Sequence, residues 1–179
     1  WGTLCTVLKE AETFGFLDSS DNQYALFAPT NEAFENSDYS LELLLQNKAA
    51  IQSLMATHIT ENVLPYDGLT CDLSLEMLNY YYTNTLCIGS RKVQNADGNE
   101  LRNLPIIDES ANILANNGII HPVSNLIIPF EFSVHTQLVD GSTGNSTDTH
   151  IVDTILHFVG NLTANQKKQK KIQKKKKKK

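Results

Sequence analysis

The 179-residue sequence is poor in cysteine, proline and glycine, and it contains no long apolar run. No stretch approaches the roughly 18 consecutive apolar residues that a membrane-spanning helix needs, so we expect no transmembrane segment in this piece of chain. The three cysteines are far apart. No Cys-x-x-Cys or close Cys-His pattern accompanies them, which argues against a zinc site. We therefore expect neither a metal nor an organic cofactor.

Basic residues are almost missing until the end of the chain. All 20 acidic residues, but only five of the 15 basic residues, precede Lys167. Residues 1–166 therefore carry a formal net charge of −15, whereas the last 13 residues carry +10. An acidic body repels phosphate groups, so we expect no nucleic acid among the natural partners.

The motifs of common enzyme classes are missing as well. The sequence has no Gly-x-Ser-x-Gly elbow, phosphate-binding loop, dinucleotide-binding fingerprint or zinc pattern. Neighbouring carboxylates, Glu10 with Glu12 and Asp108 with Glu109, are interpreted as surface charge. We name no catalytic residue and expect the chain not to be an enzyme. An unrecognised secreted hydrolase is the alternative that we favour less.

The spacing of apolar residues indicates helices first and mostly strands afterwards. Helical spacing runs over residues 4–14 with a predicted stop at Gly15, and it returns over residues 48–58. The period then falls to two, most clearly over residues 72–77, which is typical of a half-buried strand. Because helices and strands do not alternate regularly along the chain, we expect an α+β fold.

Two segments carry the most information. Tyr24–Phe34 reads YALFAPTNEAF, and Asn117–Pro129 reads NGIIHPVSNLIIP. In the first segment an apolar run ends at a proline, and Thr30 is placed to cap a helical turn with its hydroxyl group. The two segments, in this order and at this separation, resemble the two signature motifs of the fasciclin domain. That family consists of extracellular adhesion and matrix modules rather than enzymes.

The resemblance implies a wedge-shaped α+β domain of about seven strands in twisted sheets, with several helices packed on them. The first motif would form a strand and a short helix, and the second would form closing strands beside it, with one shared core. The residues that gain a structural role from the resemblance are Phe27, Ala28, Pro29, Thr30, Asn31, Phe34, Asn117, Gly118, Ile120, His121 and Pro129. Gly118 would tolerate a positive φ in a turn. Pro122 cannot donate to a sheet, so it would lie at an edge or bulge.

The resemblance also implies positions for recognition. Many adhesion-competent members have a Tyr-His pair at the end of the third helix, where this chain has Thr57-His58. Members also often have Asp-Ile shortly before the second motif, where this chain has Asn112-Ile113. Four residues are therefore candidates for recognition: His58, Ile59, Asn112 and Ile113. A histidine on an apolar helical stripe is also typical of a buried, hydrogen-bonded structural role, and the same alternative applies to His121.

The cysteines allow one disulfide. Cys71 and Cys87 lie just before and within two predicted neighbouring strands, and a bridge would close a loop of about 16 residues. In the chain-entropy model such a bridge contributes roughly 3 kcal/mol. Two unrelated buried thiols and a metal site are the alternatives. Cys5 is left without a partner, and we expect it to be a buried free thiol.

The chain is predicted to hold nearly one whole domain and several shorter parts. Residues 1–130 match a single fasciclin domain whose start is missing, and residues 131–148 are interpreted as a polar linker. Residues 149–164 resume amphipathic helical spacing and resemble the start of a second, tandem fasciclin domain. Residues 165–179 form a lysine-rich tail that we expect to be disordered. It is interpreted as the translated poly(A) end of a transcript, as a basic tail that binds anionic surfaces, or as a solvated tail.

Asn145 and Asn161 stand in Asn-x-Ser/Thr sequons and are candidate glycosylation sites, which favours a secreted protein. With the resemblance, the sequence predicts a non-enzymatic adhesion or matrix-binding module that is secreted or held at the cell surface. It would bind extracellular or cell-surface proteins or glycans through surface helices and loops. A carrier of a small molecule or lipid is the alternative, and it requires a large apolar cavity.

Overall fold

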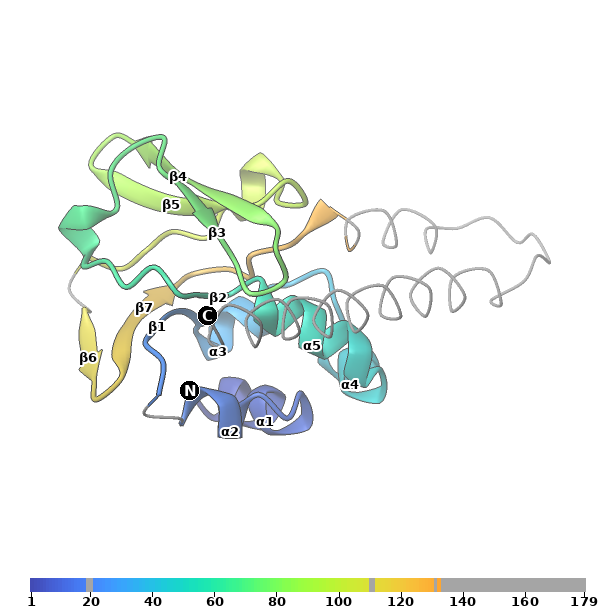
Figure 1. Ribbon diagram of the computed structural model, residues 1–179. Helices are drawn as coiled ribbons and strands as arrows, with labels where there is room; N and C mark the ends of the chain where they lie inside the picture. Colours follow the sequence, from blue (N-terminus) through green and yellow to red (C-terminus); the bar gives the residue numbers. More distant parts are fainter. Residues whose placement is uncertain (19–20, 110–111, 131, 133–179) are drawn as a thin grey trace. The chain divides into compact units, whose positions relative to one another are not determined.

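The computed structural model describes residues 1–18, 21–109, 112–130 and 132 (Figure 1). The first half contributes the elements α1 (Gly2–Glu10), α2 (Phe14–Leu17), β1 (Tyr24–Pro29), α3 (Asn31–Glu35), α4 (Leu41–Gln46), α5 (Lys48–Ala56) and β2 (Ile59–Thr60). The second half contributes the short 3-10 helices η1 (Tyr66–Gly68) and η2 (Leu101–Asn103), and the strands β3 (Ser74–Glu76), β4 (Tyr82–Ile88), β5 (Arg91–Asn95), β6 (Ile113–Ala115) and β7 (Gly118–Val123). The α+β fold is therefore as predicted.

The strands form two sheets. Sheet A has the order β2-β1-β7-β6, and sheet B has the order β3-β4-β5. Strands β1 and β7 lie side by side in parallel, with Leu26 opposite Ile120 and Phe27 opposite His121. The two sequence motifs therefore form the centre of sheet A, which confirms that the second motif pairs beside the first.

Two buried clusters lie on opposite faces of sheet A, whereas we expected one core. Successive residues of a strand point to opposite faces. Leu26 therefore packs with residues of α1 and α5, while Phe27 packs with residues of sheet B such as Leu75. Figure 1 shows sheet B on one side of sheet A and helices α1 and α2 on the other. Ile120 packs against the helical cluster, so the expectation that Phe27 and Ile120 share a core is wrong.

Side-chain oxygens cap the first turns of α3 and α4, and the cap at Thr30 is as predicted. The Thr30 hydroxyl oxygen accepts a hydrogen bond from the Ala33 N–H at 3.2 Å, and Ser40 accepts one from Leu43 at 3.5 Å. These bonds satisfy N–H groups that the first turn of a helix leaves without partners. Phe34, on α3, is buried as expected.

The first helix ends earlier than its apolar spacing predicts. Helix α1 stops at Glu10, and Glu12 adopts a left-handed φ of 54°. The chain therefore turns before it reaches Gly15, which lies inside α2. The predicted stop at Gly15 is wrong because the reversal takes place at Glu12.

Gly118 is required for close packing. The turn consists of residues 116 and 117, and Gly118 is the first residue of β7. Among the described glycines a positive φ occurs at Gly89, so the predicted positive φ of Gly118 is wrong. A Cβ atom at Gly118 would overlap the carbonyl oxygen of Tyr24. The absence of a side chain allows β1 and β7 to approach.

Pro122 lies within β7, an internal strand of sheet A, and not at the expected edge or bulge. Its carbonyl oxygen accepts a hydrogen bond from the Asp108 N–H at 3.0 Å. Strand β6 pairs with β7 only from Gly118 to Ile120, so β6 does not extend beside Pro122. The missing N–H of Pro122 therefore removes no bond between β6 and β7.

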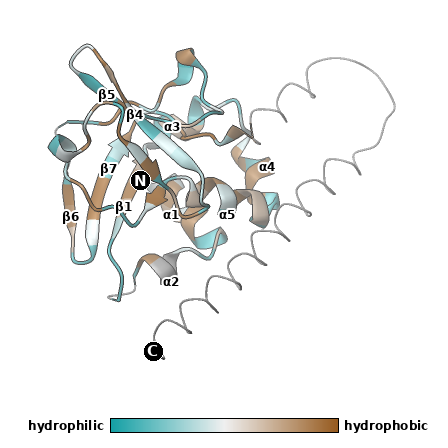
Figure 2. Cartoon of the chain, turned by 45° about the horizontal axis from the view of Figure 1, so that its top comes forward, coloured by the Kyte–Doolittle hydropathy of each residue, from teal (hydrophilic) through white to brown (hydrophobic). Residues whose placement is uncertain are grey.

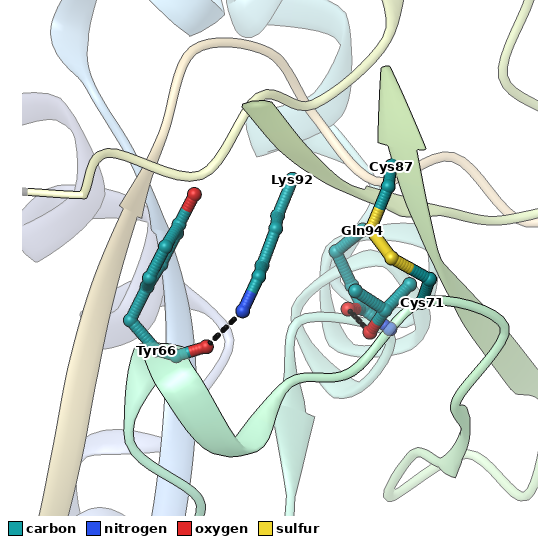
Figure 3. The surroundings of a disulfide bond; sticks show 6 residues. Tyr66, Cys71, Cys87, Lys92 and Gln94 are labelled. Atoms are coloured by element: carbon teal, nitrogen blue, oxygen red, sulfur yellow. Dashed lines mark hydrogen bonds between the residues drawn. A yellow bond between two sulfur atoms is a disulfide. The ribbon is translucent and has the colours of Figure 1, made fainter. Parts of the chain in front are cut away.

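A disulfide fastens sheet B. It joins Cys71, which precedes β3, to Cys87 in β4, and the two Cα atoms are 5.4 Å apart (Figure 3). The buried Gln94 side chain donates to the Thr83 hydroxyl group at 2.7 Å and accepts from the Thr85 hydroxyl group at 2.8 Å. Hydrogen bonds of this kind allow polar side chains to be buried between β4 and β5.

Cys5 is exposed, so the expectation of a buried thiol is wrong. The buried residues of α1 are Leu4, Val7 and Leu8, and helical spacing places Cys5 beside this stripe. The predicted linker apart from Phe132, the segments 149–164 and 165–179, and the sequons at Asn145 and Asn161 lie outside the described residues. Among the described helices, none combines the length and the apolar character that a membrane span requires.

Candidate functional site

The fold separates the four recognition candidates into a buried pair and an exposed pair. His58 follows α5 and is fully buried. Its Nε2 atom accepts a hydrogen bond from the Ile127 N–H at 2.9 Å, and its Nδ1 atom lies 2.8 Å from the Leu54 carbonyl oxygen. Because a backbone N–H can only donate, Nδ1 carries the proton of the neutral ring. Burial lowers the pKa of His58 to about 4.

Ile59 is fully buried as well and pairs with Leu26 in sheet A. Neither His58 nor Ile59 can touch a partner, so their burial excludes the recognition role implied by the resemblance. The physical reason is that the chain passes from α5 directly into β2, which pairs with β1 in sheet A. His58 instead matches the alternative interpretation of a buried, hydrogen-bonded histidine.

His121, which belongs to the second motif, is also a buried histidine. Its Nε2 atom lies 2.8 Å from the Leu64 carbonyl oxygen, and its ring stacks on Phe27 with 5.4 Å between the ring centroids. Burial lowers the pKa of His121 below its ordinary value. These contacts belong to the cluster that faces sheet B, and they also match the structural alternative.

The exposed pair lies at the edge of sheet A. The Asn112 side-chain oxygen accepts a hydrogen bond from the Tyr66 N–H at 2.9 Å, which holds this residue beside η1. Tyr66 is held in turn by Lys92, whose Nζ donates to the Tyr66 carbonyl oxygen at 2.7 Å (Figure 3). Ile113 begins β6 and is 43% exposed, and Leu114 is 81% exposed. A partner could therefore reach this pair and the strand that follows it.

Strand β6 is the last strand of sheet A, and within the described ranges no strand pairs with its outer edge. The Tyr24 N–H donates to the Asn117 carbonyl oxygen at 3.0 Å, so residue 117 faces β1 and Gly118 faces β6. Hydrogen-bonded and non-hydrogen-bonded pairs alternate along an antiparallel ladder. The register that pairs Leu114 with Ile119 therefore directs the N–H and C=O groups of Leu114 away from β7.

An apolar groove of about 360 Å³ adjoins this edge. It lies between the first two helices and sheet A, and its lining includes Leu4, Leu8, Leu17, Leu26, Ala115 and Ile120. Trp1, the single tryptophan of the chain, lies at the groove and is 47% exposed. Among the residues that the structure describes, the lining contains Asp18 and no lysine, arginine or histidine.

The groove was not predictable from the sequence. Its walls come from the beginning and the end of the domain, so no local pattern marks it. The nearest signal was the apolar character of Ile113 and Leu114, which are exposed rather than buried.

The chemistry available at this surface is that of binding. Apolar walls can take up apolar side chains, and the outward N–H and C=O groups of Leu114 can pair with another backbone. In the part of the chain that the structure describes, no group of three or more histidine, cysteine, aspartate or glutamate side chains is arranged to hold a metal ion.

The sequence is similar to a known domain family and to several known proteins. A sequence model of the fasciclin domain matches residues 1–129. The chain is 26% identical over 144 residues to the FAS1 domain-containing protein YLR001C of Saccharomyces cerevisiae, a match that covers 77% of this chain and 16% of the relative. It is 34% identical over 110 residues to the transforming growth factor-beta-induced protein ig-h3 of Sus scrofa, covering 61% and 15%. It is 31% identical over 110 residues to periostin of Homo sapiens, covering 61% and 12%.

Among solved structures, the FAS1 domain pair of the insect cell adhesion molecule Fasciclin I aligns with a TM-score of 0.46 and 17% identity, over 69% of this chain and 40% of that chain. The present chain thus spans 12–16% of the length of the three curated relatives. Because the family model covers residues 1–129, the chain belongs to the fasciclin domain family, whose members are non-enzymatic adhesion proteins.

Proposed function

We propose that the domain is an extracellular adhesion or matrix-binding module whose partner is a protein or a glycan. Membership of the fasciclin domain family is the observation that carries this proposal. The disulfide between Cys71 and Cys87 supports the extracellular location, because both residues are exposed and an exposed disulfide persists in an oxidising compartment.

The accessible surface near β6 supports a binding role. Of the residues that the resemblance implied for recognition, Asn112 and Ile113 are the ones that a partner can reach. They adjoin Leu114 and Ala115 in β6, and Ala115 lines the apolar groove. Exposed apolar surface of this kind is typical of a site for interaction.

Tandem copies would strengthen such a contact. The segment 149–164 resembles the start of a second fasciclin domain, and two linked domains bind a surface more tightly than one because the second contact is intramolecular. We therefore expect the parent protein to adhere through several weak domain contacts.

A carrier of a small apolar molecule is the second candidate, because the groove is apolar. Ligand pockets that retain a molecule usually bury most of its surface. This groove is only partly enclosed by the helices and the sheet. The geometry therefore favours contact with the surface of a partner over sequestration of a free ligand.

Cell attachment to surfaces coated with the full chain tests the proposal, together with bead aggregation and panels of matrix proteins and glycans. The lysine-rich tail could hold anionic cell surfaces by charge alone. A matched variant with all ten lysines of residues 167–179 replaced by glutamine controls for that effect. We expect attachment above an albumin coat in both proteins. No attachment, or attachment that disappears in the variant, would contradict the proposed role of the domain.

Passage through the secretory route can be tested separately. Expression in secreting cells should add glycans at Asn145 and Asn161, which enzymatic deglycosylation would reveal as a loss of mass. The variants Asn145→Gln and Asn161→Gln should each remove one part of that mass. An unmodified secreted chain would remove the sequons as support for this route.

A further inference from the structure

We infer that the outer edge of β6 takes up an extended strand of a partner protein, apolar at alternate positions and basic at both ends. The apolar side chains of that strand would continue the wall of the groove. This inference rests on the proposed adhesive function and names the part of the partner that the domain holds.

The backbone of β6 provides the first argument. The N–H and C=O groups of Leu114 point away from β7, and no described strand pairs with them. Sheets commonly protect an edge with charged residues, proline or a bulge. The three residues of β6 are Ile113, Leu114 and Ala115, which include none of these. An apolar edge without such protection is suited to the addition of a strand.

The directions of the side chains provide the second argument. Ile113 is opposite Ile120, and Ala115 is opposite Gly118, so these side chains share one face of sheet A. Ala115, Gly118 and Ile120 line the groove. A strand paired with β6 would therefore place its alternate side chains on the groove side of the sheet. Figure 2 shows hydrophobic colouring on β6 and β7 in this region.

The opposite face of the new pair would cover Leu114. This side chain is 81% exposed, and it points away from the groove side. A partner residue directly across from Leu114 would have its Cβ atom about 5 Å away, within reach of an apolar contact. One added strand would therefore cover exposed apolar surface on both faces of β6.

The charges around β6 select a basic partner. Asp18 lines the groove next to the hairpin turn, where the Asn117 side chain donates to the Leu17 carbonyl oxygen at 2.6 Å. Beyond the other end of β6, the exposed residue Asp108 is positioned by its backbone N–H, which donates to the Pro122 carbonyl oxygen in β7. Lysine or arginine residues that flank an apolar strand would lie near these carboxylates. A second copy of the domain is disfavoured, because two acidic bodies repel each other.

The single tryptophan allows a direct test on the full chain. Trp1 lies at the groove, so its emission should shift when the groove is covered. The probe is the synthetic peptide KKTVTVTKK, titrated into the wild-type chain and into a tail-neutralised variant with all ten lysines of residues 167–179 replaced by glutamine. The second protein removes repulsion between the tail and the peptide. We expect saturable binding in both.

Two matched pairs identify the edge of β6 as the binding site. Leu114→Pro removes the outward N–H and should weaken binding by about tenfold or more, whereas Leu114→Thr keeps the backbone and should weaken it by less than about threefold. The same peptide with N-methyl groups on three successive central residues should not saturate. It keeps the charge and side chains of the probe and does not depend on the folding of a variant.

Several results would overturn the inference. The first is equal affinity of the wild type and Leu114→Pro for KKTVTVTKK. The second is equal affinity of the wild type for this peptide and for its N-methylated form. The third is tighter binding of EETVTVTEE than of KKTVTVTKK by the tail-neutralised variant. A Trp1 shift caused by decanoate but not by the peptide would assign the groove to a small apolar ligand instead.

Cell attachment separates this inference from the proposed function. Attachment that persists unchanged in Leu114→Pro would overturn the strand inference and leave the adhesive function standing. Peptide binding that depends on Leu114, in a chain that attaches to no cell or matrix, would support the strand inference and contradict the proposed function.

Discussion

The Nε2 atom of His58 accepts a hydrogen bond from the backbone N–H of Ile127 at 2.9 Å. The opposite ring nitrogen is bonded to Leu54 in the last turn of α5. One neutral imidazole therefore joins the helical half of the domain to the closing segment of the second motif. The position that the family resemblance marked for recognition acts inside the fold.

Replacement of His58 by alanine should destabilise the domain strongly. The change leaves the Ile127 N–H buried without its partner and creates a cavity, and together these effects should cost about 3–5 kcal/mol. His58→Gln keeps an acceptor and most of the volume, so it should cost less. Denaturant unfolding monitored by circular dichroism measures both. A loss below about 1 kcal/mol in His58→Ala would show that the bond to Ile127 is not structural.

Acid should weaken the fold through His58. The unfolded chain takes up a proton near the ordinary histidine pKa of 6.5, whereas the folded chain stays neutral down to about 4. The folded state binds fewer protons in this window, so stability is complete above pH 6.5 and falls as the pH decreases to about 4. The expected loss is about 3 kcal/mol, since one pKa unit corresponds to 1.36 kcal/mol. His121, whose pKa is also lowered by burial, acts in the same direction.

The measurement compares unfolding free energies between about pH 7 and pH 4 for the wild type and His58→Gln. The difference in stability between the two proteins should shrink as the pH falls, because the glutamine side chain does not titrate. A difference that is constant over this range would contradict a neutral, buried His58.

Removal of the disulfide should destabilise the domain by about 3 kcal/mol, since the bridge closes a 16-residue separation between Cys71 and Cys87. The double variant Cys71→Ala, Cys87→Ala and the reduced wild type should unfold alike. Cys5→Ser is the matched control, and it should change stability little because Cys5 is an exposed free thiol. Identical unfolding of oxidised and reduced wild type would contradict this contribution.

Gly118→Ala should force β7 away from β1, because a Cβ atom would overlap the Tyr24 carbonyl oxygen. Backbone atoms cannot rotate aside as a flexible side chain can, so we expect a loss of about 3 kcal/mol or more in thermal or denaturant unfolding. Gly15→Ala is the matched control. It meets no atom within 4 Å and lies in α2, so it should be neutral or slightly stabilising. Equal effects of the two changes would contradict this account of Gly118.

Local chemistry was predictable from the sequence. Thr30 caps a helix because its hydroxyl group reaches an N–H group only three residues away. The pairing of the two motifs followed from the family resemblance. The two-cluster interior also had a signal, since β1 is a continuous apolar run and such runs are typical of strands buried on both faces.

Features that depend on distant neighbours were not predictable. Gly118 is required by the carbonyl oxygen of Tyr24, and His58 is held by Ile127, far along the chain in each case. The groove joins Leu4 to Ile120 across almost the whole domain. Apolar spacing alone describes one element at a time. It therefore predicts individual helices and strands, but not the groove that forms between them.

Hydrogen exchange at the Leu114 amide tests most directly whether the domain takes up its partner at the edge of β6. In the free chain we expect Leu114 to exchange faster than Ile113 and Ala115, whose amides face β7. Saturation with KKTVTVTKK should slow exchange at Leu114 by about tenfold or more and leave its two neighbours nearly unchanged. A Leu114 amide that is already protected in the free chain, or that stays unprotected when the peptide saturates Trp1 emission, would contradict the proposed site.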